Sequence, residues 1–149
     1  MVVISAFFDC FIDKELEDKI VGRGLIIRLW CWTSFKKEKG WTLPYPALID
    51  TGAHTSLIPK RIWYDLPVNK LAEHYTGGLV PKPECKLDVD VGEVSFALLD
   101  RDNITKRYRV LSFLMPTDDI PLIIGFKDLL SEFKIWFDYN ENRAGIEEK

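Results

Sequence analysis

Asp50 stands at the end of an apolar run and is followed directly by Thr51 and Gly52, in the sequence ALIDTGA over residues 47–53. A carboxylate that follows a buried strand, with a glycine two residues on, can sit on a tight turn and act there as an acid or a base. An aspartate in this position also commonly starts an ordinary turn between two strands. The tripeptide alone leaves the catalytic and the structural interpretation open.

Two further segments help to decide between the catalytic and the structural interpretation. Ile123, Ile124 and Gly125 form a short apolar run that a glycine closes. Between the two apolar runs, Gly77-Gly78-Leu79 suits either a loop tip that approaches a ligand closely or a plain hairpin turn.

Other catalytic groups are scarce. The chain has two histidines, and neither lies at metal-ligand spacing from a cysteine or a carboxylate, so we expect no metal and no cofactor. The three cysteines (Cys10, Cys31 and Cys85) are scattered and odd in number, which suits free thiols in a reducing compartment. The chain contains no Gly-x-Ser-x-Gly elbow and no recognisable signature of a nucleophilic cysteine, which counts against a serine or cysteine hydrolase.

The composition limits which binding partners and which cellular compartment we expect. The net charge of −3 over 149 residues gives no reason to expect nucleic acid or an anionic membrane. No apolar run approaches the roughly 20 residues of a membrane span, and the N-terminus lacks a basic leader and a cleavage site. We therefore expect a cytoplasmic protein.

The alternation of apolar and polar residues predicts a mainly β chain. We expect strands over residues 24–32, 44–49, 87–99, 108–115, 120–124 and 133–138. Short helical segments are expected over 13–20, 59–66 and 126–132. No linker or repeat divides residues 1–149, so we expect one domain, with a polar tail over 141–149 that frays.

Taken together, the motifs resemble those of the aspartic proteases. Residues 47–53 resemble the active-site loop, with Ala53 as in the retroviral type, where pepsin-like enzymes carry serine. Ile123-Ile124-Gly125, followed by a short helix, resembles the family's second motif, and Gly77-Gly78-Leu79 resembles its flap tip. Residues 133–138 resemble the C-terminal strand of single-domain bacterial and archaeal members, so the resemblance covers about residues 24–139 and leaves 1–23 unplaced.

This resemblance implies a retropepsin-like acid-protease fold, a single lobe with one short C-terminal helix. Asp50 would activate a water for peptide hydrolysis together with a second carboxylate. The chain has one Asp-Thr-Gly, so the second Asp50 would come from another copy in a homodimer. Thr51 would hydrogen-bond across the pair, Gly52 would present its backbone, and the flap would close over an extended peptide or unfolded protein.

Two positions depart from the retroviral pattern. That group carries an acidic residue four positions after the catalytic aspartate and an arginine just after the second glycine, whereas this chain has His54 and Phe126. The ion pair that helps to orient the dimer is therefore missing. The apolar run 2–8 is either a source of dimer contacts, together with the C-terminal strand, or a strand of the chain's own sheet.

Two functions stay open at this point. The first is an aspartic endopeptidase, which we expect to be most active at mildly acidic pH, because Ala53 lacks the hydroxyl with which a serine favours the ionised carboxylate. The alternative is a catalytically weak or inactive dimer of the same fold that binds peptides as an adaptor.

Overall fold

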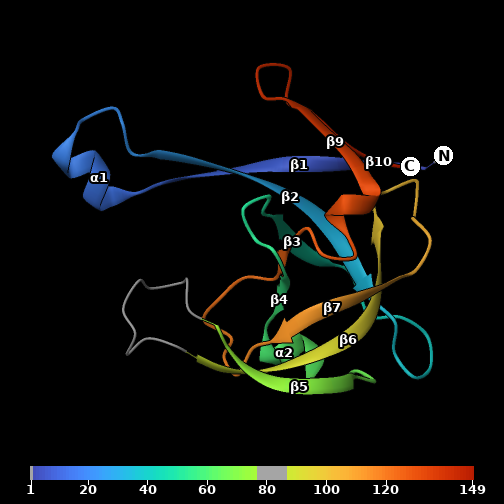
Figure 1. The fold of residues 1–149 in the computed structure, drawn as a ribbon. Coiled ribbons are helices and arrows are strands. Elements are labelled where there is room, and N and C mark those ends of the chain that lie inside the picture. Colours follow the sequence, from blue (N-terminus) through green and yellow to red (C-terminus); the bar gives the residue numbers. More distant parts are fainter. Residues whose placement is uncertain (1, 77–86) are drawn as a thin grey trace.

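The computed structural model describes residues 2–76 and 87–149, and most of them lie in β-strands (Figure 1). The first half of the chain forms β1 (Val3–Ile12), α1 (Lys14–Lys19), β2 (Leu25–Phe35), β3 (Tyr45–Ile49), β4 (Ser56–Ile58) and α2 (Lys60–Trp63). The second half forms β5 (Asn69–Thr76), β6 (Leu87–Leu99), β7 (Tyr108–Leu114), β8 (Ile123–Ile124), the 3₁₀ helix η2 (Leu130–Glu132), β9 (Phe133–Asp138) and β10 (Arg143–Glu148). No helix in these two ranges is long and apolar enough to cross a membrane.

The strands are joined in the order β5-β6-β7-β4-β8-β3-β2-β1-β10-β9. Most neighbours are antiparallel, but β3 and β8 run parallel, as do β4 and β7. Strand β6 also pairs with β2, from Trp32↔Leu99 to Phe35↔Phe96, so the middle of the sheet curves back on itself. This curvature encloses a core to which both ends and the middle of the chain contribute, with Ile4, Phe35, Phe96, Leu98, Ile124, Leu129 and Ile146 among its fully buried side chains.

The C-terminal segment is ordered, so the expectation of a frayed tail over residues 141–149 is wrong. Strand β10 lies between β1 and β9, and Ile146 is fully buried. The ring of Trp136 lies against Gly145, and a Cβ at position 145 would be 2.6 Å from two of its carbons. Pairing with two strands, the buried Ile146 and the close contact of Gly145 with Trp136 together hold this polar segment in the sheet.

The N-terminal segment, which the sequence left unplaced, also belongs to the sheet. The first half of β1 pairs with β10, from Val3↔Glu147 to Ala6↔Ala144, so the run 2–8 is a strand of the chain's own sheet. The backbone N–H of Ser5 donates to the Asp100 carboxylate at 2.7 Å. Partial burial would raise the pKa of Asp100, but the backbone donors of Ser5, Asp102 and Asn103 outweigh it and lower that pKa.

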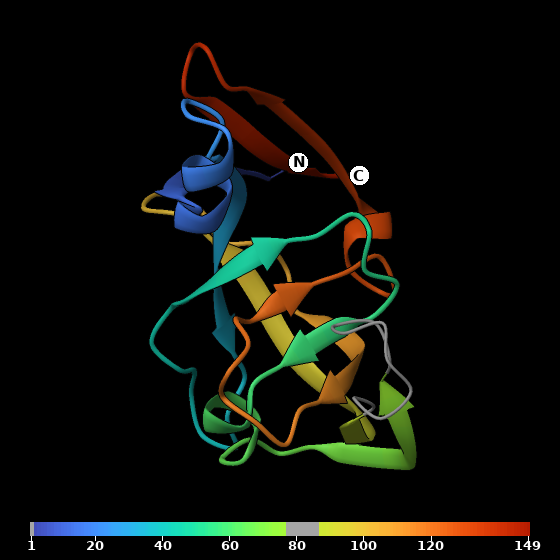
Figure 2. The same ribbon diagram turned by 90° about the vertical axis from the view of Figure 1, so that its left-hand side faces the viewer.

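The outer half of β1 pairs with β2 from Phe7↔Trp30 to Ile12↔Leu25, and α1 joins the two strands. This ribbon and helix, residues 7–30, form an arm that stands away from the body in Figure 1 and points toward the viewer in Figure 2. Helix α1 agrees with the expected segment 13–20, and Asp13 caps it by accepting from the Leu16 N–H at 3.2 Å.

The segment after β8 is less helical than expected. Residues 126–129 form turns, and only the single 3₁₀ turn η2 follows. Asp128 adopts a positive φ of 63°, which an α-helix does not allow, and its carboxylate accepts from the Leu111 N–H at 3.0 Å. Leu129 and Leu130 are thereby buried under β9 as a compact turn.

Ile146→Ala tests whether β10 is an integral strand. Because the side chain is fully buried, its truncation should lower the free energy of unfolding by about 2–5 kcal/mol in urea denaturation. Ile104→Ala is the matched control, because Ile104 is 53% exposed. This substitution should change the free energy of unfolding by about 0.5 kcal/mol or less. Equal, small effects at both positions would contradict the place given to β10.

Candidate active site

The backbone folds around Asp50 into a short closed loop. The Asp50 N–H donates to the Ile124 carbonyl at 3.1 Å, and the Asp50 carbonyl accepts from the Ala53 N–H at 3.1 Å. The Oδ1 atom of Asp50 accepts from the Gly52 N–H at 2.9 Å. Asp50 is half-buried, whereas Thr51 and Gly52 are exposed. The loop thus holds one carboxylate in a fixed orientation and presents its own tip outward.

Strand β8 brings the second motif beside the first. It runs parallel to β3, with Leu48 opposite Ile123 and Ile49 opposite Ile124. Past the strand, the Phe126 N–H donates to the Ala53 carbonyl at 3.0 Å, and the Lys127 N–H donates to the His54 carbonyl at 2.9 Å. Two segments some 70 residues apart are therefore joined through main-chain hydrogen bonds.

Gly125 lies where these two segments approach most closely. A Cβ at this position would be 2.7 Å from the Ala53 carbonyl oxygen and 3.0 Å from that of Thr55, so only glycine fits. Its N–H donates to the hydroxyl oxygen of Ser56 at 3.0 Å, and Ser56 is fully buried. Sequence reasoning missed Ser56, although a hydroxyl inside the run SLI directly after the loop was a signal that it had a buried partner.

A hollow of about 490 Å³ opens beside the Asp50 carboxylate. Strand β2 and the residues around β3 and β8 form its walls, namely Ile27, Arg28, Leu29, Leu48, Ile49, Pro121 and Ile123. Most of these residues are apolar, so the hollow offers apolar contacts to a bound group while it stays open to solvent. The site therefore combines an accessible carboxylate with apolar walls.

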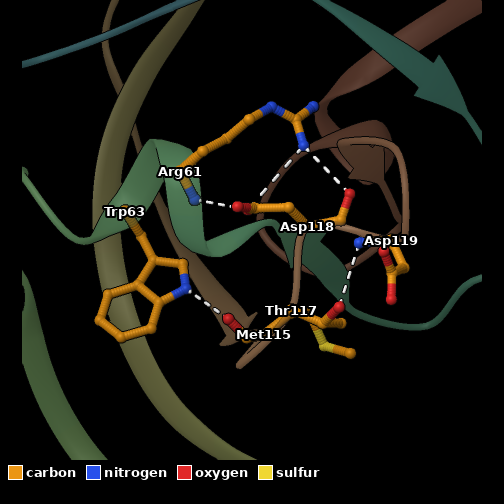
Figure 3. A network of polar contacts seen from close by, with 6 residues as sticks. All are labelled: Arg61, Trp63, Met115, Thr117, Asp118 and Asp119. Carbon is orange, nitrogen blue, oxygen red and sulfur yellow. Dashed lines mark hydrogen bonds and ion pairs between the residues drawn. The ribbon is translucent and has the colours of Figure 1, made fainter.

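Helix α2 is hydrogen-bonded to the segment that leads into β8 (Figure 3). The Arg61 N–H donates to Asp118 Oδ1 at 2.7 Å, and the Trp63 Nε1–H donates to the Met115 carbonyl at 2.8 Å. The Asp119 N–H donates to Thr117 Oγ1 at 3.0 Å. The 3.9 Å ion pair between Arg61 and Asp118 is half exposed and adds little. These bonds fix residues 115–119, which lead into Pro121 and β8.

The structure brings together most, but not all, of the residues singled out in the sequence. The loop 50–53 and the segment 123–125 meet in one site. The expected flap tip, Gly77-Gly78-Leu79, lies outside the residues that the structure describes, although β5 and β6 pair as far as Thr76↔Leu87.

The two departures from the retroviral pattern, His54 and Phe126, both have exposed side chains. Their backbone groups take part in the main-chain bonds that join the loop to the segment after β8, Phe126 as donor and His54 as acceptor. The contact between these segments therefore requires no charge pair.

No protein-family model matches the sequence, and no curated protein matches it. Among solved structures, a retropepsin-like aspartic protease from Rickettsia conorii is similar, with a TM-score of 0.50 and 11% sequence identity. The similarity covers 98% of this chain and 95% of that chain. Identity this low supports the fold alone, and on that ground the expected mainly β, retropepsin-like fold is confirmed.

Ser56→Ala tests the link between the loop and β8. The change leaves the buried Gly125 N–H without its acceptor, which should lower the free energy of unfolding by about 1–3 kcal/mol in urea denaturation. Ser131→Ala, at an exposed position, should change it by about 0.5 kcal/mol or less. If the two variants unfold alike, the Ser56 hydroxyl does not stabilise the site.

Proposed function

We propose that this protein is an aspartic endopeptidase that hydrolyses peptide bonds with Asp50 from each of two chains. The observation that carries the proposal is the Asp50 loop, whose backbone turns back on the carboxylate and is hydrogen-bonded to the Ile124–Gly125 segment. An ordinary turn between strands needs no such second segment. The retropepsin-like fold supports the same assignment.

In this proposal two carboxylates share one proton and a water lies between them. The ionised carboxylate takes a proton from the water while the protonated one donates to the carbonyl oxygen of the scissile bond. The resulting tetrahedral intermediate collapses when the C–N bond breaks and the amine nitrogen receives a proton from the pair. That proton is the one taken from the water, and the other carboxylate takes back the proton it gave to the carbonyl oxygen, which leaves the new carboxylic acid. The pair again holds one proton, and no metal or covalent intermediate takes part.

The second carboxylate is proposed to come from another copy of the chain. A two-fold axis beside the loop would bring Asp50 to its own symmetry mate, as an isologous dimer requires. The exposed Thr51 and Gly52 would then meet the same residues of the partner, with Thr51 bonding across the pair. An extended polypeptide would bind along the hollow, where apolar walls favour apolar side chains beside the cut bond.

Asp50→Asn is the direct test of activity. The native protein should cleave a reduced, carboxymethylated protein at mildly acidic pH, and pepstatin should block the cleavage. The amide cannot act as the base, so the variant should lose at least about 100-fold in rate. Asp102→Asn, which changes an exposed turn residue, should retain native activity.

Two outcomes would count against the enzyme. Cleavage by Asp50→Asn at the native rate would assign the activity to another group or to a contaminant. No cleavage by a native protein that sediments as a dimer would favour the alternative, a peptide-binding adaptor, and the search would turn to partners that dock as an extended strand.

The pH profile tests the role of Ala53. A hydroxyl at this position could donate to the carboxylate and favour its ionised form, so Ala53→Ser should move the pH optimum to lower values. We expect the native optimum at mildly acidic pH, measured as kcat/KM on one peptide across the range. A native optimum below about pH 3 would contradict this expectation.

A further inference from the structure

Arg28 contributes the charged side chain that shares the hollow with Asp50. Strands β2 and β3 pair antiparallel as far as Trp30↔Leu48, and beyond this pair Arg28 and Asp50 both line the hollow. Since residues i and i+2 of a strand face the same side, the Arg28 side chain leaves β2 on the face of Trp30. The two charges therefore flank one hollow from neighbouring strands.

No internal acid neutralises Arg28 within the described part of the chain. It takes part in none of the ion pairs there, and its guanidinium lies over the ring of Phe11 at 4.9 Å from the ring centre. Asp9 faces Arg28 across the β1–β2 pair but forms no ion pair with it. The aromatic contact places the guanidinium against β1 on the arm, and no ion pair of the described residues occupies its N–H donors.

We propose that Arg28 determines specificity by binding an acidic side chain of the substrate within two residues of the cut bond; this rests on the proposed function. In the proposed reaction Asp50 acts on the water and the scissile carbonyl, so among the described residues that line the hollow Arg28 is the charged group left for substrate recognition. A guanidinium matches a carboxylate with two parallel hydrogen bonds. The substrate class is therefore a polypeptide with aspartate or glutamate next to apolar residues at the cleavage site.

The expected preference for glutamate over glutamine follows from the strength of a hydrogen bond between charged groups. A hydrogen bond between charged groups contributes about 1.5–3 kcal/mol, so glutamate should be preferred over glutamine by about 10- to 100-fold in kcat/KM. Asp9 competes with the substrate for Arg28 because it lies opposite on the same face. Asp9→Asn should accordingly increase the preference.

The test begins with cleavage sites mapped in an unfolded protein. Peptides spanning one site are made in pairs that differ only in glutamate or glutamine, placed in turn at two positions on either side of the cut. The native protein should prefer the glutamate peptide of at least one pair, and Arg28→Met should reduce that preference to about twofold or less. Arg23→Met is the matched control, because Arg23 lies on the same arm but outside the hollow.

A binding measurement separates this inference from the proposed activity. The Asp50→Asn protein is titrated with labelled apolar peptides, each carrying a single glutamate or glutamine, and fluorescence anisotropy reports Kd. Tighter binding of the glutamate peptides, lost in the Asp50→Asn, Arg28→Met double variant, supports the role of Arg28 even if the native protein cleaves nothing.

Three results would overturn the proposed role of Arg28. The first is equal cleavage of glutamate and glutamine peptides by an active native protein, which leaves the protease itself intact. The second is an absence of binding, or equal binding of both kinds of peptide by Asp50→Asn. The third is an Arg28→Met variant that loses both peptides alike and no longer sediments as the native protein does, because Arg28 would then be structural.

Discussion

The geometry of the site depends on the main-chain contact between the loop at Asp50 and the segment that ends β8. Four hydrogen bonds, from the N–H groups of Asp50, Phe126, Lys127 and Gly125, cross between the two segments. Gly125 permits the approach, since any side chain there would collide with the carbonyl oxygens of Ala53 and Thr55. This junction determines the position and orientation of the Asp50 carboxylate. The surrounding strands bring the two segments of the junction together.

The rest of the fold supports this junction from two directions. On one side, α2 and its bonds to residues 115–119 fix the chain that enters β8. On the other, β2 runs beside β3 and carries Arg28 and Leu29 to the edge of the hollow. Both termini strengthen the sheet around β2, because β1 pairs with β2 and with β10. The catalytic proposal therefore draws on residues from most of the chain's length.

Sequence reasoning succeeded where the signal is local and strong. The loop 50–53, the segment 123–125 and the main strands could be predicted because glycine placement and apolar runs are read directly from neighbouring residues. It failed for β10, because a segment with Ile146 as its main buried side chain resembles a polar tail until its partners are known. It overestimated the helix after β8, because the positive φ of Asp128 is set by tertiary contacts. Arg28 was missed because its place beside Asp50 in the hollow appears only once the chain is folded.

The arm of residues 7–30 has few contacts that would resist bending. A two-stranded ribbon is marginally stable by itself, and its helix α1 buries no residue. Regions with few buried contacts open locally at low free-energy cost, without unfolding of the core. Because Arg28 lies on this ribbon while Asp50 lies at the junction, we expect bending of the arm to change the separation of the two charges. The width of the hollow would then follow the arm and suit side chains of different length.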